Sequence, residues 1–295
     1  ELSGQCIGLS FLYSGSFACN ASRDPFGTTR AVMGLQPEHF DYPLAPGELF
    51  QTPETAIAYS AEGLACLSQR FHRMIADHVC RGPWKNRRRP VLINNWEATG
   101  MRFDGEKILS IAKKASELGV EMMVLDDGWF GAREDDNAGL GDWTVNSGKL
   151  GCTMGQLAQK IRDMGMKFGL WIEPEMVNED SDLYRSHPEW VLKMEGKKPV
   201  RGRYELVLDL SNKEVTDYLK AVLSSLIERG KLSYMKWDYN RFITDFHSSV
   251  TPSGRIEYDY ILGLYSVLEY LNEKYPDLLI EGCSGGGGRF DLGML

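Results

Sequence analysis

The sequence lacks several features that would point to common classes of function. Its six cysteines show no CxxC spacing, which disfavours zinc and dithiol redox sites. No apolar stretch approaches the length of about 20 residues that a membrane span needs. The only basic run is Arg87–Arg89, and the net charge of −8 disfavours nucleic acid or anionic membrane as a partner. We therefore expect an ordinary globular protein with free thiols and neither of these partners.

The two ends predict a piece of a longer protein, truncated on both sides. The chain begins at Glu1 without Met, inside a predicted strand, and residues 1–11 lack the basic start and apolar core of a secretion signal. It stops at Leu295 directly after a Gly-rich loop. From the free thiols and the missing signal we expect a cytoplasmic location.

The residue pattern changes near residue 83. Residues 1–83 hold short apolar runs between Gly, Ser and Pro, which predict antiparallel strands, and helical spacing over residues 64–78 predicts a connecting helix. In residues 84–295 strand and helix patterns alternate instead, which predicts a separate domain. The predicted strands of this second domain lie at residues 90–96, 122–126, 167–172, 206–210, 232–235 and 278–281.

Repeated βα units with continuous apolar strands predict a parallel sheet covered on both faces. A doubly wound open sheet is the alternative, but it should have a Gly-rich phosphate turn after its first strand, where Asn94-Asn-Trp-Glu97 stands instead. Polar and aromatic residues follow every predicted strand, as in barrels whose chemistry is built from several strand ends. We therefore predict an α/β fold, a (β/α)8 TIM barrel with about six of its eight units present.

The segment Tyr234–Arg241 is the strongest candidate for chemistry. Lys236 and Asp238 are two residues apart, so they point to the same side of a strand and are expected to pair. The cation would keep the Asp238 carboxylate ionised, as a covalent nucleophile at a strand end requires. A salt bridge that only positions a loop is the structural alternative.

Asp126 and Asp127 place two carboxylates at another strand end, where they can accept hydrogen bonds from neighbouring sugar hydroxyls. Trp96 and Trp171 also lie at the ends of predicted strands. Aromatic side chains there suit the apolar face of a pyranose. The structural alternative for Asp126 and Asp127 is an Asp-Gly pair that only forms a turn.

A metal site is a competing use for these carboxylates. Together with Glu173 and Glu175, Asp126 and Asp127 could offer oxygen ligands to magnesium or calcium. Tryptophans and the Lys236–Asp238 pair are not needed by such a site, so we expect no metal and no other cofactor. The glycine run 285–288 lacks the Lys-Ser/Thr ending of a phosphate loop.

Five motifs in order resemble the glycoside hydrolase family 36 α-galactosidases. They are Asn94-Asn-Trp-Glu97, Leu125-Asp-Asp-Gly-Trp129, Gly169-Leu-Trp-Ile-Glu-Pro-Glu-Met176, Lys236-Trp-Asp-Tyr-Asn-Arg241 and Cys283-Ser-Gly-Gly-Gly-Gly-Arg-Phe-Asp291. Residues 1–83 resemble the tail of that family's N-terminal β-sandwich plus a linker, and residues 84–295 its catalytic barrel.

The resemblance implies a retaining hydrolase that releases terminal α-galactose from melibiose- and raffinose-type oligosaccharides, without a cofactor. It implies Asp238 as the nucleophile. The further sugar contacts that it implies are Trp96, Asp126, Asp127, Trp171, Arg203, Lys236, Asn240, Cys283 and Gly286. The whole protein would be a homo-oligomer, as in the often tetrameric family.

The same resemblance leaves the second catalytic acid outside this chain. In the family the acid/base lies in a Trp-Thr-Ser-Asp-Asp-like segment downstream of the Gly-rich loop, so we expect it after Leu295. Asp291 is the only late carboxylate, and the family pattern gives it no such role. Two other readings therefore stay open: a galactosyl transferase of the raffinose-synthase kind, and a galactoside-binding fragment without catalysis.

Overall fold

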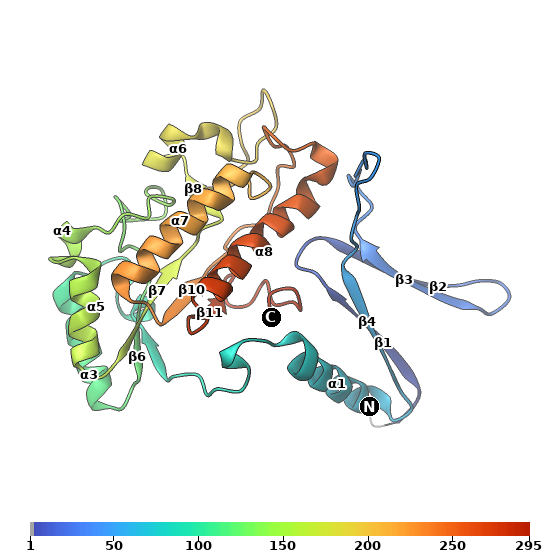
Figure 1. Cartoon of the computed structure of the whole chain (residues 1–295), viewed down its shortest axis with the longest axis horizontal. Coiled ribbons are helices and arrows are strands. Elements are labelled where there is room, and N and C mark those ends of the chain that lie inside the picture. Colours follow the sequence, from blue (N-terminus) through green and yellow to red (C-terminus); the bar gives the residue numbers. More distant parts are fainter. Residues whose placement is uncertain (1–2) are drawn as a thin grey trace.

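The structure, a computed structural model, describes residues 3–295 and is built around a curled parallel sheet (Figure 1). Its five strands lie in the order β11-β10-β7-β6-β5, each parallel to its neighbours. Their bounds are β5 Leu92–Asn94, β6 Met122–Leu125, β7 Lys167–Ile172, β10 Tyr234–Trp237 and β11 Leu279–Gly282. The predicted α/β class with a parallel, barrel-like sheet is confirmed.

One predicted strand lies outside this sheet. Residues 206–210 were expected to form the fourth strand, but β9 (Glu205–Val207) pairs antiparallel with β8 (Met176–Asn178), and β10 joins β7 directly. Pro174, which has no N–H, stands between β7 and β8. The chain resumes after it as β8, and this strand provides the partner for β9.

The longer helices follow one another along the sheet (Figure 1). Neighbours in this row are α3 (Gly105–Glu117), α5 (Met154–Asp163), α7 (Lys213–Gly230) and α8 (Ile256–Lys274). Side-chain caps begin three of them: Asp104, Thr153 and Asn212 accept backbone N–H bonds at the starts of α3, α5 and α7. Short helices complete the barrel region: α2 Trp96–Thr99, α4 Ser147–Leu150 and α6 Asp182–Ser186.

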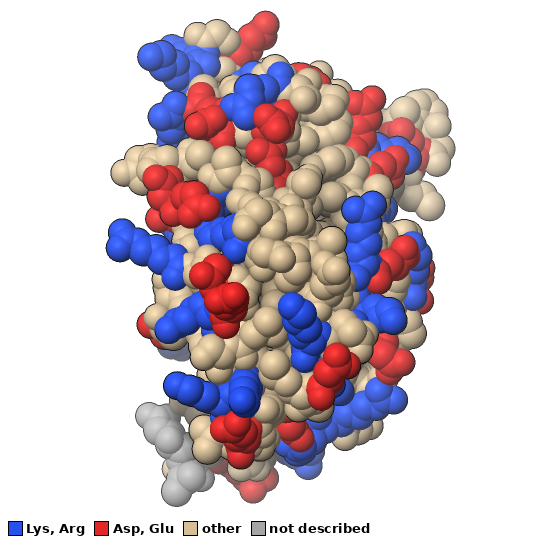
Figure 2. Space-filling model, turned by 90° about the vertical axis from the view of Figure 1, so that its left-hand side faces the viewer, with Lys and Arg blue, Asp and Glu red and all other residues tan. Residues whose placement is uncertain are grey.

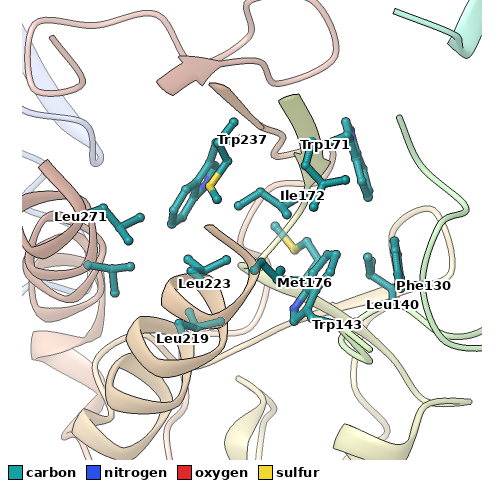
Figure 3. Close-up of a cluster of buried hydrophobic side chains, with 14 of the residues drawn as sticks. Phe130, Leu140, Trp143, Trp171, Ile172, Met176, Leu219, Leu223, Trp237 and Leu271 are labelled. Atoms are coloured by element: carbon teal, nitrogen blue, oxygen red, sulfur yellow. The ribbon is translucent and has the colours of Figure 1, made fainter. Parts of the chain in front are cut away.

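A large core lies between the sheet and this row of helices, and a second, small cluster joins Met122, Val124 and Tyr234. In Figure 3, Trp237 at the end of β10 lies near Leu223 of α7 and Leu271 of α8, all of them fully buried. Farther along, the nearly parallel rings of Trp171 and Phe130 have centroids 6.2 Å apart. This packing fixes the ends of β7 and β10, the two strands that hold the central residues of the site.

The N-terminal region consists of two antiparallel strand pairs and a helix. β1 (Cys6–Leu12) pairs with β4 (Glu54–Ser60), β2 (Phe17–Arg23) pairs with β3 (Thr29–Leu35), and α1 (Gly63–Met74) follows. The β2–β3 pair projects away from the helices (Figure 1). Contacts to α8 join the two regions, including hydrogen bonds from Tyr258 to the Gln51 carbonyl, 2.6 Å, and from the Ser14 backbone to Tyr265, 2.9 Å.

The charges on the surface and the length and polarity of the helices are relevant to possible partners. On the face that Figure 2 shows, basic and acidic side chains are interspersed around a central uncharged area. Within residues 3–295, every helix is too short or too polar to span a membrane.

Candidate active site

The carboxyl ends of the parallel strands bring most of the predicted site residues to one edge of the sheet. Because all five strands point the same way, residues that follow them meet at the same rim. The residues at this rim are Asn94 at the end of β5 and Trp96 after it, Asp126 and Asp127 after β6, Trp171 in β7, Lys236 and Asp238 at β10, and Cys283 after β11.

Asp238 is the most completely bonded carboxylate of this rim. One oxygen, Oδ1, accepts the backbone N–H groups of Tyr239 at 3.0 Å, Ser284 at 2.9 Å and Gly285 at 3.4 Å. The other, Oδ2, accepts the indole N–H of Trp171 at 3.0 Å. These donors fix the orientation of the carboxylate.

The same contacts set the charge of Asp238. Burial alone raises the pKa of this carboxyl, since only 7% of the residue is exposed. Hydrogen bonds outweigh burial and lower the pKa to about 2; they come from the Asn240 side chain, the Ser284 backbone, Trp171 and Cys283. Asp238 is therefore an ionised, oriented carboxylate at neutral pH.

The predicted Lys236–Asp238 pair is wrong. Lys236 Nζ instead donates to Asp126 Oδ2 at 2.9 Å, and Asn94 Nδ2 donates to the same oxygen. Strand periodicity places Lys236 and Asp238 on one side, but it does not reveal that Asp126, two strands away in the sheet, lies within reach of the lysine. Hydrogen-bond donors are the main cause that lowers the pKa of Asp238, and Lys236 forms its ion pair with Asp126.

Asp127 turns away from Asp126 toward a buried arginine. Arg133, which is fully buried, donates from Nε to Oδ1 of Asp127 at 3.1 Å and from a terminal nitrogen to Oδ2 at 3.0 Å. Burial raises the pKa of Asp127, and Arg133 acts against that rise. Arg133 in turn donates to Asn178 Oδ1 at 3.0 Å, which ties this corner to β8.

Two further carboxyls, those of Glu173 and Glu205, are fully buried. Glu173 Oε1 accepts the Asn240 backbone N–H at 2.6 Å, while its Oε2 has no hydrogen-bond partner. Neither oxygen of Glu205 has one. Burial raises the pKa of both, and the neighbouring charges of Asp238 and Glu173, respectively, raise them further.

Arg203 stands beside Glu205, with its Nε 3.8 Å from Glu205 Oε1 and a terminal nitrogen 3.4 Å from Asp136 Oδ1. Its side chain is 42% exposed, so it can still reach a ligand.

The remaining predicted contacts lie at the same rim, Trp96 at the start of α2, Trp171 in β7 and the others in loops. Trp96 is 36% exposed, which leaves part of its ring free for a sugar face, whereas Trp171 is almost fully buried and presents its N–H to Asp238. The side chains of Cys283 and Asn240 face the Asp238 carboxyl and lower its pKa. Gly286 lies in the exposed turn 285–288 with a φ of +94°, a conformation that favours glycine.

The four carboxylates considered as metal ligands have separate partners. Asp126 contacts Lys236, Asp127 contacts Arg133, and Glu173 accepts from Asn240. Glu175 forms a two-bond pair with Arg289, 2.7 and 3.0 Å, and also accepts from Trp237 and Tyr260. In the described part of the chain, residues 3–295, no three His, Cys, Asp or Glu side chains gather as a metal site would require.

Sequence reasoning missed several residues of this site. Arg133 lies in an irregular charged loop, and Ser284 contributes its backbone, so neither has a pattern that marks it. Glu205 directly precedes the predicted strand 206–210 and was not singled out. The late carboxylate Asp291 accepts hydrogen bonds from Ser14, Gly293 and Met294, so its contacts are with the N-terminal region and its own turn.

Comparison with known proteins shows which family the chain matches. The family model described as Melibiase matches residues 49–295, and that of the glycosyl hydrolase family 36 N-terminal domain matches residues 1–45. The chain is 53% identical to the bifunctional alpha-galactosidase/sucrose kinase AgaSK of Mediterraneibacter gnavus, and it is 47% identical to the alpha-galactosidase AgaA of Geobacillus stearothermophilus. All of the chain is covered in both, but it spans only 31% and 41% of the lengths of these relatives.

Solved structures of these relatives have the same fold. The galactosidase domain of AgaSK superposes on the whole chain with a TM-score of 0.96, over 40% of its own length, and AgaA does so with 0.97 over 42%. A variant of AgaA, 46% identical, was solved in complex with raffinose; it also has a TM-score of 0.97 over the whole chain, which covers 42% of it. The chain therefore belongs to the melibiase family, glycoside hydrolase family 36.

Proposed function

We propose that the whole protein is a retaining α-galactosidase and that residues 1–295 provide its nucleophile and much of its sugar site. The observation that supports this most is the state of Asp238, an ionised carboxylate held by several donors at the carboxyl end of β10. The relatives that the chain matches are named alpha-galactosidases. An oriented carboxylate at a barrel rim is what attack on an anomeric carbon needs.

The proposed reaction is a double displacement. Asp238 attacks the anomeric carbon as the glycosidic C–O bond breaks, and the departing oxygen takes a proton from a second carboxylic acid. Water then attacks the same carbon, gives its proton to that second carboxylate, and releases Asp238. Each step inverts the carbon, so the released galactose keeps the α configuration.

The second acid should lie about 5–5.5 Å from Asp238 on the sugar's other face. Glu173 and Glu205 are fully buried, and Asp126 and Asp127 are engaged by cations. In line with the family resemblance, we propose that the acid/base of the whole protein lies after Leu295.

The sugar contacts are proposed from the rim geometry. Asp126 and Lys236 form a polar pair that can bind ring hydroxyls, since the carboxylate of Asp126 accepts hydrogen bonds and the ammonium of Lys236 donates them. Trp96 offers an exposed aromatic face for the C–H side of galactose. Asp127, Trp171, Arg203, Asn240, Cys283 and Gly286 complete the proposed set.

We propose melibiose- and raffinose-type oligosaccharides as substrates. Solved relatives were crystallised with raffinose and with stachyose, and both sugars end in α-linked galactose. We further propose that residues 1–83 belong to an N-terminal β-sandwich and linker, residues 84–295 to the barrel, and that the protein works without a cofactor as a cytoplasmic homo-oligomer such as a tetramer. Light scattering of the whole protein tests the last point.

The test follows the anomeric configuration of galactose released by the whole protein, using NMR early in the reaction. Retention supports the proposal, and inversion contradicts it. Asp238→Gly should abolish turnover, while azide should restore reaction and yield β-galactosyl azide. Asp104→Asn, which can still cap α3, is the matched control and should behave like the wild type. Transfer to an added acceptor sugar in preference to water would instead support the transferase, and binding without turnover a non-catalytic protein.

A further inference from the structure

Glu175, between β7 and β8, is a fully buried carboxylate that the proposed reaction does not use. Its Oε1 accepts the indole N–H of Trp237 at 2.8 Å and a terminal N–H of Arg289 at 2.7 Å. Its Oε2 accepts the Tyr260 hydroxyl at 2.7 Å and the other terminal nitrogen of Arg289 at 3.0 Å. A buried ion pair is stable only when further hydrogen bonds satisfy it, and here both carboxylate oxygens have two donors.

Arg289, the partner of Glu175, directly follows the glycine run 285–288. Both of its terminal nitrogens bond to Glu175, and only 10% of its side chain is exposed. Its guanidinium carbon lies 4.2 Å from the ring centroid of Tyr239, the residue after Asp238. One side chain therefore joins the end of the glycine run both to the connection between β7 and β8 and to the residue beside Asp238.

The glycine run needs such an anchor because its own residues restrain it little. Residues 285–288 are exposed, and Ser284 and the first three glycines all have φ angles between +56° and +114°. Glycine loses more conformational freedom on folding than any other residue, so holding this run in one shape is entropically costly. The N–H groups of Gly287 and Gly288 donate to the Ser284 carbonyl at 3.3 and 2.8 Å. These bonds close the turn, but they do not fix its place relative to Asp238.

The start of this turn supplies two of the donors to Asp238. The backbone N–H groups of Ser284 and Gly285 lie 2.9 and 3.4 Å from Asp238 Oδ1, and the Ser284 hydroxyl donates to the Tyr239 carbonyl at 2.8 Å. Before the turn, the N–H of Cys283 donates to the Trp237 carbonyl at 2.7 Å, which ties the chain to the end of β10. After the turn, the bonds of Arg289 to Glu175 tie it a second time.

We propose that Glu175 and Arg289 form a clamp that positions the glycine turn, so that the N–H groups of Ser284 and Gly285 stay on the carboxylate of Asp238. Both are positioning residues, because they act on Asp238 through the turn. Their part in catalysis rests on the proposed function, in which Asp238 is the nucleophile. The order that the clamp gives to the turn does not depend on that function.

The chemistry of arginine suits this task. Its planar guanidinium pairs with a carboxylate through two parallel hydrogen bonds, which fix orientation as well as distance, whereas the ammonium of lysine is a point charge. The ring of Tyr239 supports the guanidinium from another side through a cation–π contact. If the clamp opens, the turn gains freedom and its N–H groups leave Asp238 for part of the time. The pKa of Asp238 then rises, because the hydrogen bond from the Ser284 backbone is one of the causes that lower it.

The first test measures amide hydrogen exchange in the whole protein by mass spectrometry, on the peptide that contains residues 283–289. Arg289→Lys keeps the charge but loses the paired bonds, and exchange in this peptide should rise about tenfold or more, as expected for one lost charge-assisted hydrogen bond. The double variant Glu175→Gln/Arg289→Met leaves neither charge buried alone and should show the same rise.

Arg185→Lys is the matched control, because Arg185 also bonds two carboxylates, Asp180 and Asp182, but on the exposed surface of α6. Its glycine turn should exchange as in the wild type. A rise confined to the turn in the clamp variants supports the clamp. An unchanged turn in both clamp variants, or a rise spread over the whole barrel, would overturn it, since Glu175 and Arg289 would then hold nothing or hold the fold in general.

The second test measures the pH profile of kcat/KM on the whole protein, with circular dichroism at each pH to confirm the fold. The acid limb should move to higher pH by about one unit in Arg289→Lys and stay in place in Arg185→Lys. Glu173, Lys236 and Cys283 are the titratable groups that face Asp238, and they are the same in every variant. A loosened turn with an unmoved acid limb would overturn the positioning role. An inactive wild type would count against the proposed function, and hydrogen exchange would still decide the clamp.

Discussion

Replacing Trp171 with Phe removes one hydrogen bond from Asp238 and keeps most of the surrounding packing. The indole N–H of Trp171 donates to Oδ2 of Asp238 at 3.0 Å, and Phe has no donor. The benzene ring of Phe can still lie against Phe130, whose ring is nearly parallel to that of Trp171 (Figure 3). The substitution therefore tests a single donor to the proposed nucleophile.

The size of the effect follows from that bond. A hydrogen bond to a charged group contributes about 1.5–3 kcal/mol, and about 1.36 kcal/mol corresponds to one pKa unit. The bond favours the ionised form of Asp238, so its loss should raise the pKa by about one to two units from the value of about 2. Because the folded-state pKa is depressed, its stabilising contribution is present above about pH 4, the unfolded pKa, and is lost as the pH falls toward 2. Trp171→Phe should reduce that contribution.

The assay is an NMR titration of carbon-13-labelled aspartate carboxyls, with the Asp238 signal assigned by its loss in Asp238→Asn. The acid limb of kcat/KM in the whole protein should move in the same direction. Trp190→Phe is the matched control, because Trp190 is also buried but its indole N–H has no partner. An unchanged Asp238 pKa in Trp171→Phe, or an equal shift in the control, would refute the reasoning.

Two further predictions concern the cations of the rim. Arg133→Met leaves Asp127 buried without its counter-charge and should lower the free energy of unfolding by ~3–5 kcal/mol in urea denaturation; an unchanged midpoint would contradict the buried pair. Lys236→Gln removes the cation that contacts Asp126 and should weaken galactose binding about tenfold or more in calorimetry. Lys213→Gln, on the exposed start of α7, should bind like the wild type, and equal binding by both variants would count against a sugar role for Lys236.

Much of the fold could be predicted because its strands are apolar and continuous. β6 and β7 are buried almost throughout, and such runs between amphipathic helices indicate a parallel sheet. β2 was not predicted, since its Asn20 and Ser22 are exposed and interrupt the apolar pattern. Residues 206–210 lie outside the sheet because β9 pairs with β8. The local pattern of residues 206–210 does not reveal this pairing.

The site was less predictable than the fold, because its contacts join distant segments. The residue pattern made Asp238 a candidate nucleophile, and the family resemblance implied the same role. Its donors, however, include the backbone of Ser284, which no side-chain pattern can reveal. The pairing of Lys236 with Asp126 and the burial of Glu205 are likewise three-dimensional facts. Residue types predicted which chemistry gathers at the rim, but not which groups touch.

Labelling of the nucleophile tests directly whether Asp238 forms the covalent bond to galactose. An α-galactosyl fluoride with a second, electron-withdrawing fluorine at C5 should form the intermediate faster than water releases it. After proteolysis, mass spectrometry should find the fluorogalactosyl group on the peptide containing Asp238, and none in Asp238→Asn. A label on Glu173, Glu205 or any other residue, or rapid turnover by Asp238→Asn, would contradict the account.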